Sequence, residues 1–152
     1  MFSAECVVNE DRGHRMAYWL LKTEPSEWSW SDQVKEKRTH WDGVRNYQAS
    51  ANMKAMKVGD LCFFYHSVKA REIVGIVKVV KRYYPDHTDI TGRFGMVDVE
   101  TVKAVSKPVS LSEIKADPVF NDFQLVRQSR LSVVPVSSKH WERLCKMAET
   151  IL

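Results

Sequence analysis

The sequence lacks an apolar segment long enough to cross a membrane. Its longest apolar stretches, 61–65 and 73–80, fall far short of the roughly 20 residues that a spanning helix needs. Cysteine is also scarce: the three residues Cys6, Cys62 and Cys145 have no short spacing between them. An odd number of widely separated cysteines predicts neither a disulfide framework nor a zinc knuckle. We therefore expect Cys62 and Cys145 to be core thiols in a reducing compartment.

Sequence signatures of catalysis and of metal binding are missing as well. The sequence contains no Gly-rich phosphate-binding loop, no Gly-x-Ser-x-Gly motif and no His-Glu-x-x-His motif. Its five histidines are scattered without the spacing of metal ligands. We expect no metal, no cofactor and no enzymatic activity. Distant residues can still meet in space, so the sequence leaves a metal site or a catalytic pair open.

The composition is that of an ordinary globular domain with a mild excess of positive charge. Hydrophobic residues make up 44% of the 152 residues and charged residues 28%, so the chain can build a core without disulfides. The net charge of +4 permits an acidic partner such as nucleic acid. The absence of a lysine run argues against non-specific DNA packaging. We expect a flexible extension at 1–15, a single domain at 16–152 and a monomer.

Hydrophobic patterning predicts strands and short helices in a mixed order. Strands are expected at 18–22, 61–66, 72–83, 96–105 and 131–136, and helices at 29–37, at 47–57, after Ser110 and after Ser138. Residues 40–46 are expected to be irregular. Gly75 predicts a bulge or a close backbone approach, and Pro135 predicts an edge strand or a strand end. Because strands and helices do not alternate regularly, we expect an α+β fold with a compact β-barrel rather than a doubly wound parallel sheet.

Tryptophan placement gives the first indication of a binding site. Four of the five tryptophans lie in the first 41 residues. Trp19, Trp28 and Trp30 are expected to pack in or over the core. Trp41 differs because it lies in the segment predicted to be irregular, beside Gly43 and several polar residues. A ring in such a place either plugs the core or forms one wall of a pocket for a flat ligand.

Five motifs resemble the EVE domain family and follow one another in the family's order. They are Lys22-Thr23-Glu24-Pro25, the string from Trp41 to Ala49 (WDGVRNYQA), Val58-Gly59-Asp60, the string from Phe63 to Ser67 (FFYHS), and Arg130-Leu131-Ser132-Val133. The resemblance runs from about residue 17 to about residue 147. It implies a PUA-like fold, a twisted open β-barrel of about five to six strands with short peripheral helices, related to the YTH, SRA and ASCH domains.

The same resemblance implies a function. The family is thought to bind nucleic acid, DNA or RNA, that carries a modified base, and no catalysis is generally attributed to it. Bacterial stand-alone members would be cytoplasmic, and a eukaryotic member would be nuclear. Since a stacked base cannot be read, the base must be flipped out or presented on a single strand, and an aromatic cage would then hold it.

The resemblance also implies which residues form the cage and its surroundings. Trp41 and Phe94 would be the aromatic walls; Thr23, Glu24, Val44, Asn46, His66, Ser67, Gln128 and Ser129 would contact the ligand; and Arg45, Arg93, Arg127 and Arg130 would contact the nucleic-acid backbone. The loop between Tyr84 and Gly95 is shorter than in many relatives, which predicts an open cage.

Other interpretations stay open at this point. Asn46 could equally cap the helix that begins at Tyr47, and Arg45 could pair with Glu24 or Asp42. His66 could be a structural residue at a strand end. The same pocket could serve a small nucleoside-like ligand, or an enzyme that acts on modified nucleotides.

Overall fold

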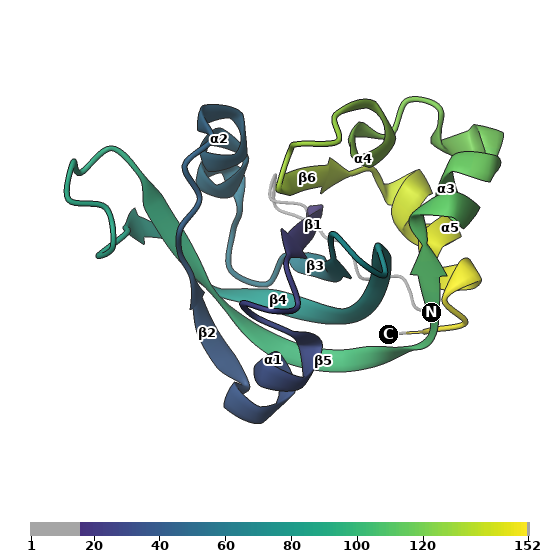
Figure 1. Cartoon of the computed structure of the whole chain (residues 1–152), viewed down its shortest axis with the longest axis horizontal. Coiled ribbons are helices and arrows are strands. Elements are labelled where there is room, and N and C mark those ends of the chain that lie inside the picture. The colour runs from purple at the N-terminus through teal and green to yellow at the C-terminus, as the bar shows by residue number, and fades with distance from the viewer. Residues whose placement is uncertain (1–15, 152) are drawn as a thin grey trace.

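A six-stranded mixed sheet forms the centre of the computed structural model, which describes residues 16–151 (Figure 1). The extension expected at 1–15 lies outside the described residues. The strands are β1 (Tyr18–Thr23), β2 (Arg38–Trp41), β3 (Leu61–His66), β4 (Glu72–Pro85), β5 (Gly95–Ser110) and β6 (Val133–Val136). The helices are α1 (Trp30–Glu36), α2 (Tyr47–Ala55), α3 (Leu111–Ala116), α4 (Gln124–Arg127), α5 (Ser138–Met147) and the short 3-10 helix η2 (Pro118–Phe120).

The strand order is β2-β5-β4-β3-β1-β6, so β2 and β6 are the two edges. β1 and β3 run parallel, and every other neighbouring pair is antiparallel. The long strands β4 and β5 curve together across the molecule, while α2, α3, α4 and α5 surround the shorter strands (Figure 1). This arrangement confirms the predicted α+β fold, a twisted open barrel. Pro135 lies in edge strand β6, as its missing N–H predicted.

The core lies on both faces of the central strands. Successive residues of a strand point to opposite faces, so the consecutive aromatics Phe63 and Phe64 of β3 need cover on both sides. Trp141 of α5 stacks on Phe63 with ring centroids 4.0 Å apart. On the other face, Trp30 and Trp41 pack edge-on against Phe64, at 5.1 and 5.6 Å. The continuous apolar run of β3 thus reflects burial on both faces.

Gly75 marks the bulge that the sequence predicted. The β4–β5 register shifts between Ile73 and Gly75, and the β3–β4 register shifts between Phe64 and Tyr65. A Cβ atom at Gly75 would lie 2.3 Å from the ring of Trp30. The close approach also predicted there is therefore confirmed, and it seats the first residue of α1 against the sheet.

Residues 38–41 are a strand, which corrects the prediction that 40–46 is irregular throughout. β2 pairs antiparallel with β5, and Trp41 lies opposite Val97. The strand was missed because it has four residues, three of them polar. Contacts with β5 stabilise this strand instead. The buried carboxylate of Asp98 accepts a hydrogen bond from the Arg38 guanidinium at 3.2 Å, and His40 Nδ1 lies 2.9 Å from the same carboxylate. Residues 42–46 do lack regular structure.

No helix within residues 16–151 has the length and apolar character needed to span a membrane.

Candidate functional site

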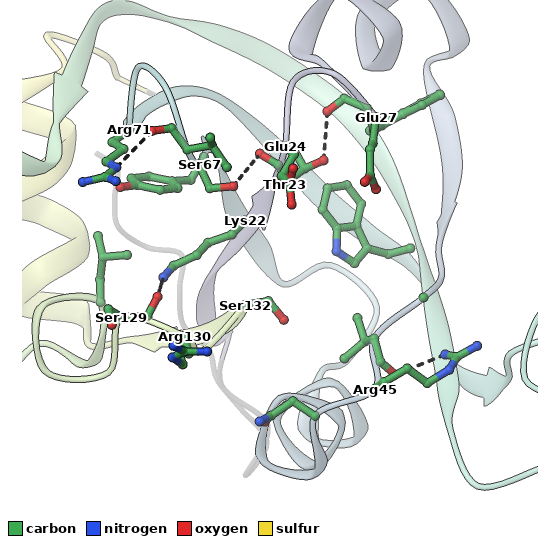
Figure 2. A pocket seen from close by; sticks show the side chains of 18 of the residues that line it. Lys22, Thr23, Glu24, Glu27, Arg45, Ser67, Arg71, Ser129, Arg130 and Ser132 are labelled. Atoms are coloured by element: carbon green, nitrogen blue, oxygen red, sulfur yellow. Dashed lines mark hydrogen bonds between the residues drawn. The ribbon is translucent and has the colours of Figure 1, made fainter.

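A cavity of about 1040 Å³ opens where the parallel strands β1 and β3 end (Figure 2). The carboxyl ends of parallel neighbours lie at the same edge of a sheet, so the segments that follow them meet. Here Ser67 joins the two ends, because its N–H and its hydroxyl both donate to the carbonyl oxygen of Thr23, at 2.9 and 3.2 Å. The other walls come from residues 39–46, from α3 and α4, and from residues 129–132. The volume lies at the upper end of ordinary ligand sites.

Three aromatic residues are part of the cavity wall: Trp28, Trp41 and Tyr65. Trp41 and Tyr65 are only 8% and 2% exposed, so most of each ring belongs to the core. Trp28 is less buried, and its Nε1 donates to Gln33 Oε1 at 2.9 Å. The carbonyl of Trp28 accepts the hydroxyl of Thr23, also at 2.9 Å, which fixes the segment after β1. The sequence placed Trp28 in or over the core and did not identify it as a cavity residue.

The segment after Trp41 is held in place by a buried carboxylate that sequence analysis missed. Asp86 accepts the N–H of Gly43 at 2.8 Å and a guanidinium N–H of Arg45 at 3.0 Å. Its other oxygen accepts the N–H and the hydroxyl of Thr88, at 2.7 and 2.6 Å. Burial by itself would raise the pKa of Asp86, but the bonds from Thr88, Gly43 and Arg45 hold it far below the usual range.

Asp86 also settles the partner of Arg45. The sequence left open a structural ion pair of Arg45 with Glu24 or Asp42, and the ion pair forms with Asp86 instead. Gly43 has a φ of +80°, which a glycine adopts without strain. This conformation turns its N–H toward the carboxylate.

Nine of the residues implied by the resemblance line this one cavity. They are Thr23, Glu24, Trp41, Val44, Arg45, Asn46, Ser67, Ser129 and Arg130. Asn46 has a second role, since its side-chain oxygen accepts the N–H of Ala49 at 2.9 Å and caps α2. The alternative of a helix cap is therefore confirmed, and Asn46 lines the cavity as well.

The remaining five residues are not in the cavity wall. Phe94 packs against Tyr47 with ring centroids 5.0 Å apart and lies under the guanidinium of Arg45, so it is not a second wall of this cavity. Gln128 and Arg127 line an adjoining hollow of about 310 Å³, which shares Asn46, Ser129 and Arg130 with the cavity. The Gln128 side chain bonds to that of Gln124. Arg93 is exposed in the turn before β5.

His66 has the structural role that the sequence left open. Its Nε2 accepts the N–H of Trp30 at 3.0 Å, where α1 begins. Burial lowers the pKa of His66, which favours the neutral ring that this bond requires. His66 therefore supports α1 and Trp30 and does not line the cavity.

Charged groups are unevenly distributed around the cavity. Lys22, Arg45, Arg71, Lys115 and Arg130 are its cationic residues, and Glu24, Glu27 and Asp42 its anionic ones. Sequence analysis missed Lys22, Arg71 and Lys115 as site residues. Within residues 16–151 there is no group of three or more His, Cys, Asp or Glu side chains that could hold a metal ion.

The chain is similar to proteins of known family and known structure. Residues 17–147 match the EVE domain family. A protein from Rhodopseudomonas palustris, solved by NMR, is 46% identical, with 88% of this chain and 94% of that chain covered and a TM-score of 0.83. Thymocyte nuclear protein 1 of Gallus gallus is 34% identical over 87% of this chain and 69% of the relative.

A third relative was solved with a ligand. The human THYN1 protein, in a crystal structure with DNA containing 5-methylcytosine, is 31% identical, with 90% of this chain and 99% of that chain covered and a TM-score of 0.83. The resemblance noted in the sequence and the PUA-like fold that it implies are thereby confirmed. The chain belongs to the EVE domain family.

Proposed function

We propose that this protein is a non-enzymatic reader that binds nucleic acid carrying a modified base, and that the base enters the cavity at the ends of β1 and β3. The observation that carries the proposal is the cavity itself, which combines aromatic wall residues with polar groups on rigid strand ends. The related human protein bound to DNA containing 5-methylcytosine makes that base the first one to test.

The lining residues suit the edge of a flat base. Glu24 and Glu27 are acceptors for an exocyclic amino group such as that of cytosine or adenine. The side-chain amide of Asn46 can donate to a ring nitrogen or a carbonyl oxygen. Trp28 offers the most accessible aromatic surface in the wall, and stacking of one base on an aromatic ring is worth roughly 1–3 kcal/mol.

Binding without catalysis is favoured by the way two hydroxyl groups of the cavity wall are used. A nucleophilic hydroxyl needs a base within hydrogen-bond reach. The hydroxyl of Thr23 instead donates to the carbonyl of Trp28, and that of Ser67 donates to the carbonyl of Thr23.

The test is a binding titration with matched oligonucleotides in single- and double-stranded DNA and RNA. Each modified oligonucleotide is compared with its unmodified twin, because the two share all phosphate contacts. Burial of a single methyl group, at about 0.8 kcal/mol, predicts a preference of roughly fourfold for the methylated strand. Equal affinity for every modified and unmodified pair would contradict the proposal. Affinity that does not change with salt would favour a small free ligand instead.

A further inference from the structure

Four cationic side chains converge on one end of the cavity, although they come from four separate parts of the chain. We call this set the basic end; it consists of Lys22 in β1, Arg71 before β4, Lys115 in α3 and Arg130 before β6. Figure 2 shows Lys22, Arg71 and Arg130 on the same side of the cavity, away from Glu27 and Arg45.

Contacts of the backbone place α3 at the basic end as well. The N–H of Leu111 donates to the carbonyl of Arg71 at 2.9 Å, which brings the start of α3 to this turn. Leu111 and Lys115 are one helical turn apart, and both line the cavity. Lys115 therefore faces the same space as Arg71.

The basic end has no carboxylate of its own among the described residues. The ion pairs within residues 16–151 join Arg38 and His40 to Asp98, Arg45 to Asp86, His140 to Asp122, and Arg143 to Asp117. None of the four cations of the basic end takes part in them. Lys22 is half-buried, whereas Arg71, Lys115 and Arg130 are exposed at the cavity. Like charges that line one cavity attract an anion from outside, which would offset their mutual repulsion.

Lys22 shows this cost most clearly. Its ammonium donates to the carbonyl of Ser129 at 2.9 Å, and an ammonium has three donors. Burial lowers the pKa of Lys22, because the charged form loses water that no carboxylate replaces. A bound anion would accept hydrogen bonds from the remaining N–H groups and would stabilise the charged form of Lys22.

Arg71 likewise has guanidinium N–H groups that no other residue within 16–151 engages. Its Nε donates to the carbonyl of Val68 at 3.1 Å, which leaves its terminal amino groups available. Both Val68 and Arg71 have positive φ, at 77° and 51°, a conformation that costs free energy in residues other than glycine. Val68 and Arg71 both line the cavity, so this uncommon backbone is part of its wall.

We propose that the basic end binds a phosphate group, which is the phosphate adjacent to the base held by the rest of the cavity. The identity of the base rests on the proposed function, whereas the anion site rests on the geometry above. The cations differ from those that the sequence indicated, because Arg45 is engaged by Asp86, and Arg93 and Arg127 lie outside the cavity. Arg130 is common to both sets.

Two ligand series test this site. The first compares 5-methyl-2′-deoxycytidine with its 5′- and 3′-monophosphates by isothermal titration. Since a charge-assisted hydrogen bond contributes more than a neutral one, at least one monophosphate should bind roughly tenfold or more tighter than the nucleoside. Lys22→Gln, Arg71→Gln and Arg130→Gln should each lose most of this gain and keep the affinity for the nucleoside. Lys139→Gln removes an exposed charge from α5 outside the cavity, so it is the matched control and should bind like the wild type.

The second series uses inorganic phosphate alone, which separates the anion site from base recognition. In a two-dimensional amide NMR spectrum, phosphate should shift the signals of residues 22, 71 and 130 in the wild-type protein, while chloride at equal ionic strength should not. The shifts should disappear in Arg130→Gln. Because the Arg130 side chain is exposed, its substitution should leave the fold intact, so misfolding would not account for the loss. Phosphate that shifts none of these signals, or variants that bind monophosphates as the Lys139→Gln control does, would overturn the site even if the methylated oligonucleotide is preferred.

Discussion

The carboxylate of Asp86 accepts the backbone N–H of Gly43 at 2.8 Å, across 43 residues of sequence. This bond fixes the segment that follows Trp41 against the turn before β5. The cavity wall at residues 41–46 therefore depends on a side chain that does not itself line the cavity. Asp86 is a positioning residue, and its effect on binding is exerted through Gly43 and Arg45.

Asp86→Asn should destabilise the protein and weaken oligonucleotide binding. An amide cannot keep the charged bonds to Arg45, Gly43 and Thr88 together, and loss of hydrogen bonds to a buried charged group costs roughly 1–3 kcal/mol. Urea denaturation measures the free energy of unfolding, and a titration measures binding. Asp89→Asn is the control, because among the described residues the carboxylate of Asp89 accepts hydrogen bonds only from Thr91 and Phe94, within the same turn. If both variants weakened binding equally, the result would contradict the role of Asp86 as a positioning residue.

The free energy of unfolding should decrease as the pH is lowered, because of His66. Burial lowers its pKa below the ordinary 6.5 in the folded state, so the unfolded chain binds the proton more readily. The stability that the neutral ring provides is complete above pH 6.5 and is lost as the pH falls from there through the folded-state pKa. His66→Gln keeps an acceptor for the Trp30 N–H and should flatten this dependence. Thermal melts at several pH values decide it, with the exposed His87→Gln as the control for loss of a histidine.

Trp28 and Trp41 should respond differently to substitution. Trp41 is 8% exposed and packs on Phe64, so Trp41→Ala should cost roughly 3–5 kcal/mol of stability in addition to any loss of binding. Trp28→Ala should leave a more stable protein than Trp41→Ala and still lose roughly 1–3 kcal/mol of binding. Thermal melts combined with oligonucleotide titration separate the two effects. Normal binding by Trp28→Ala would remove this ring from the site.

Gly75→Ala should be strongly destabilising because of Trp30. The added Cβ would lie 2.3 Å from the indole ring, and both groups are held by the core, so the clash should cost roughly 1–3 kcal/mol or more. Trp30→Leu removes the opposing ring, and in that background the alanine should cost less. A double-mutant cycle by urea denaturation measures the coupling. An equal cost in both backgrounds would show that the ring is not the cause.

Much of the fold was predictable because the strong strands carry their own signal. β1, β3, β4 and β5 are apolar or β-branched runs whose patterns reflect burial on one or both faces. β2 was not predictable in this way, because it is held by Asp98, which lies about 60 residues away along the chain. No local pattern in Arg38, Thr39 and His40 reports such a partner.

The site was predictable mainly where the family motifs carry it, and Thr23, Glu24, Ser67, Ser129 and Arg130 line the cavity as the resemblance implied. The string from Trp41 to Asn46 forms a continuous wall, and four of its residues lie in the cavity as the resemblance implied. Lys22, Arg71 and Lys115 are brought together by the sheet and by α3, and their spacing in the sequence contains no trace of this. The place of Phe94 was also not readable from the sequence, because its neighbours in space are Tyr47 and Arg45, about 50 residues earlier in the chain.

The central claim is that a modified base enters the cavity where β1 and β3 end. It is tested most directly by the amide NMR spectrum of the protein during titration with a single-stranded DNA oligonucleotide that holds one 5-methylcytosine. We predict that the largest shifts map to Thr23, Val44 and Ser67, and that the unmethylated twin produces smaller shifts at the same residues. Shifts confined to surfaces away from these residues, such as the exposed face of α5, would contradict the account.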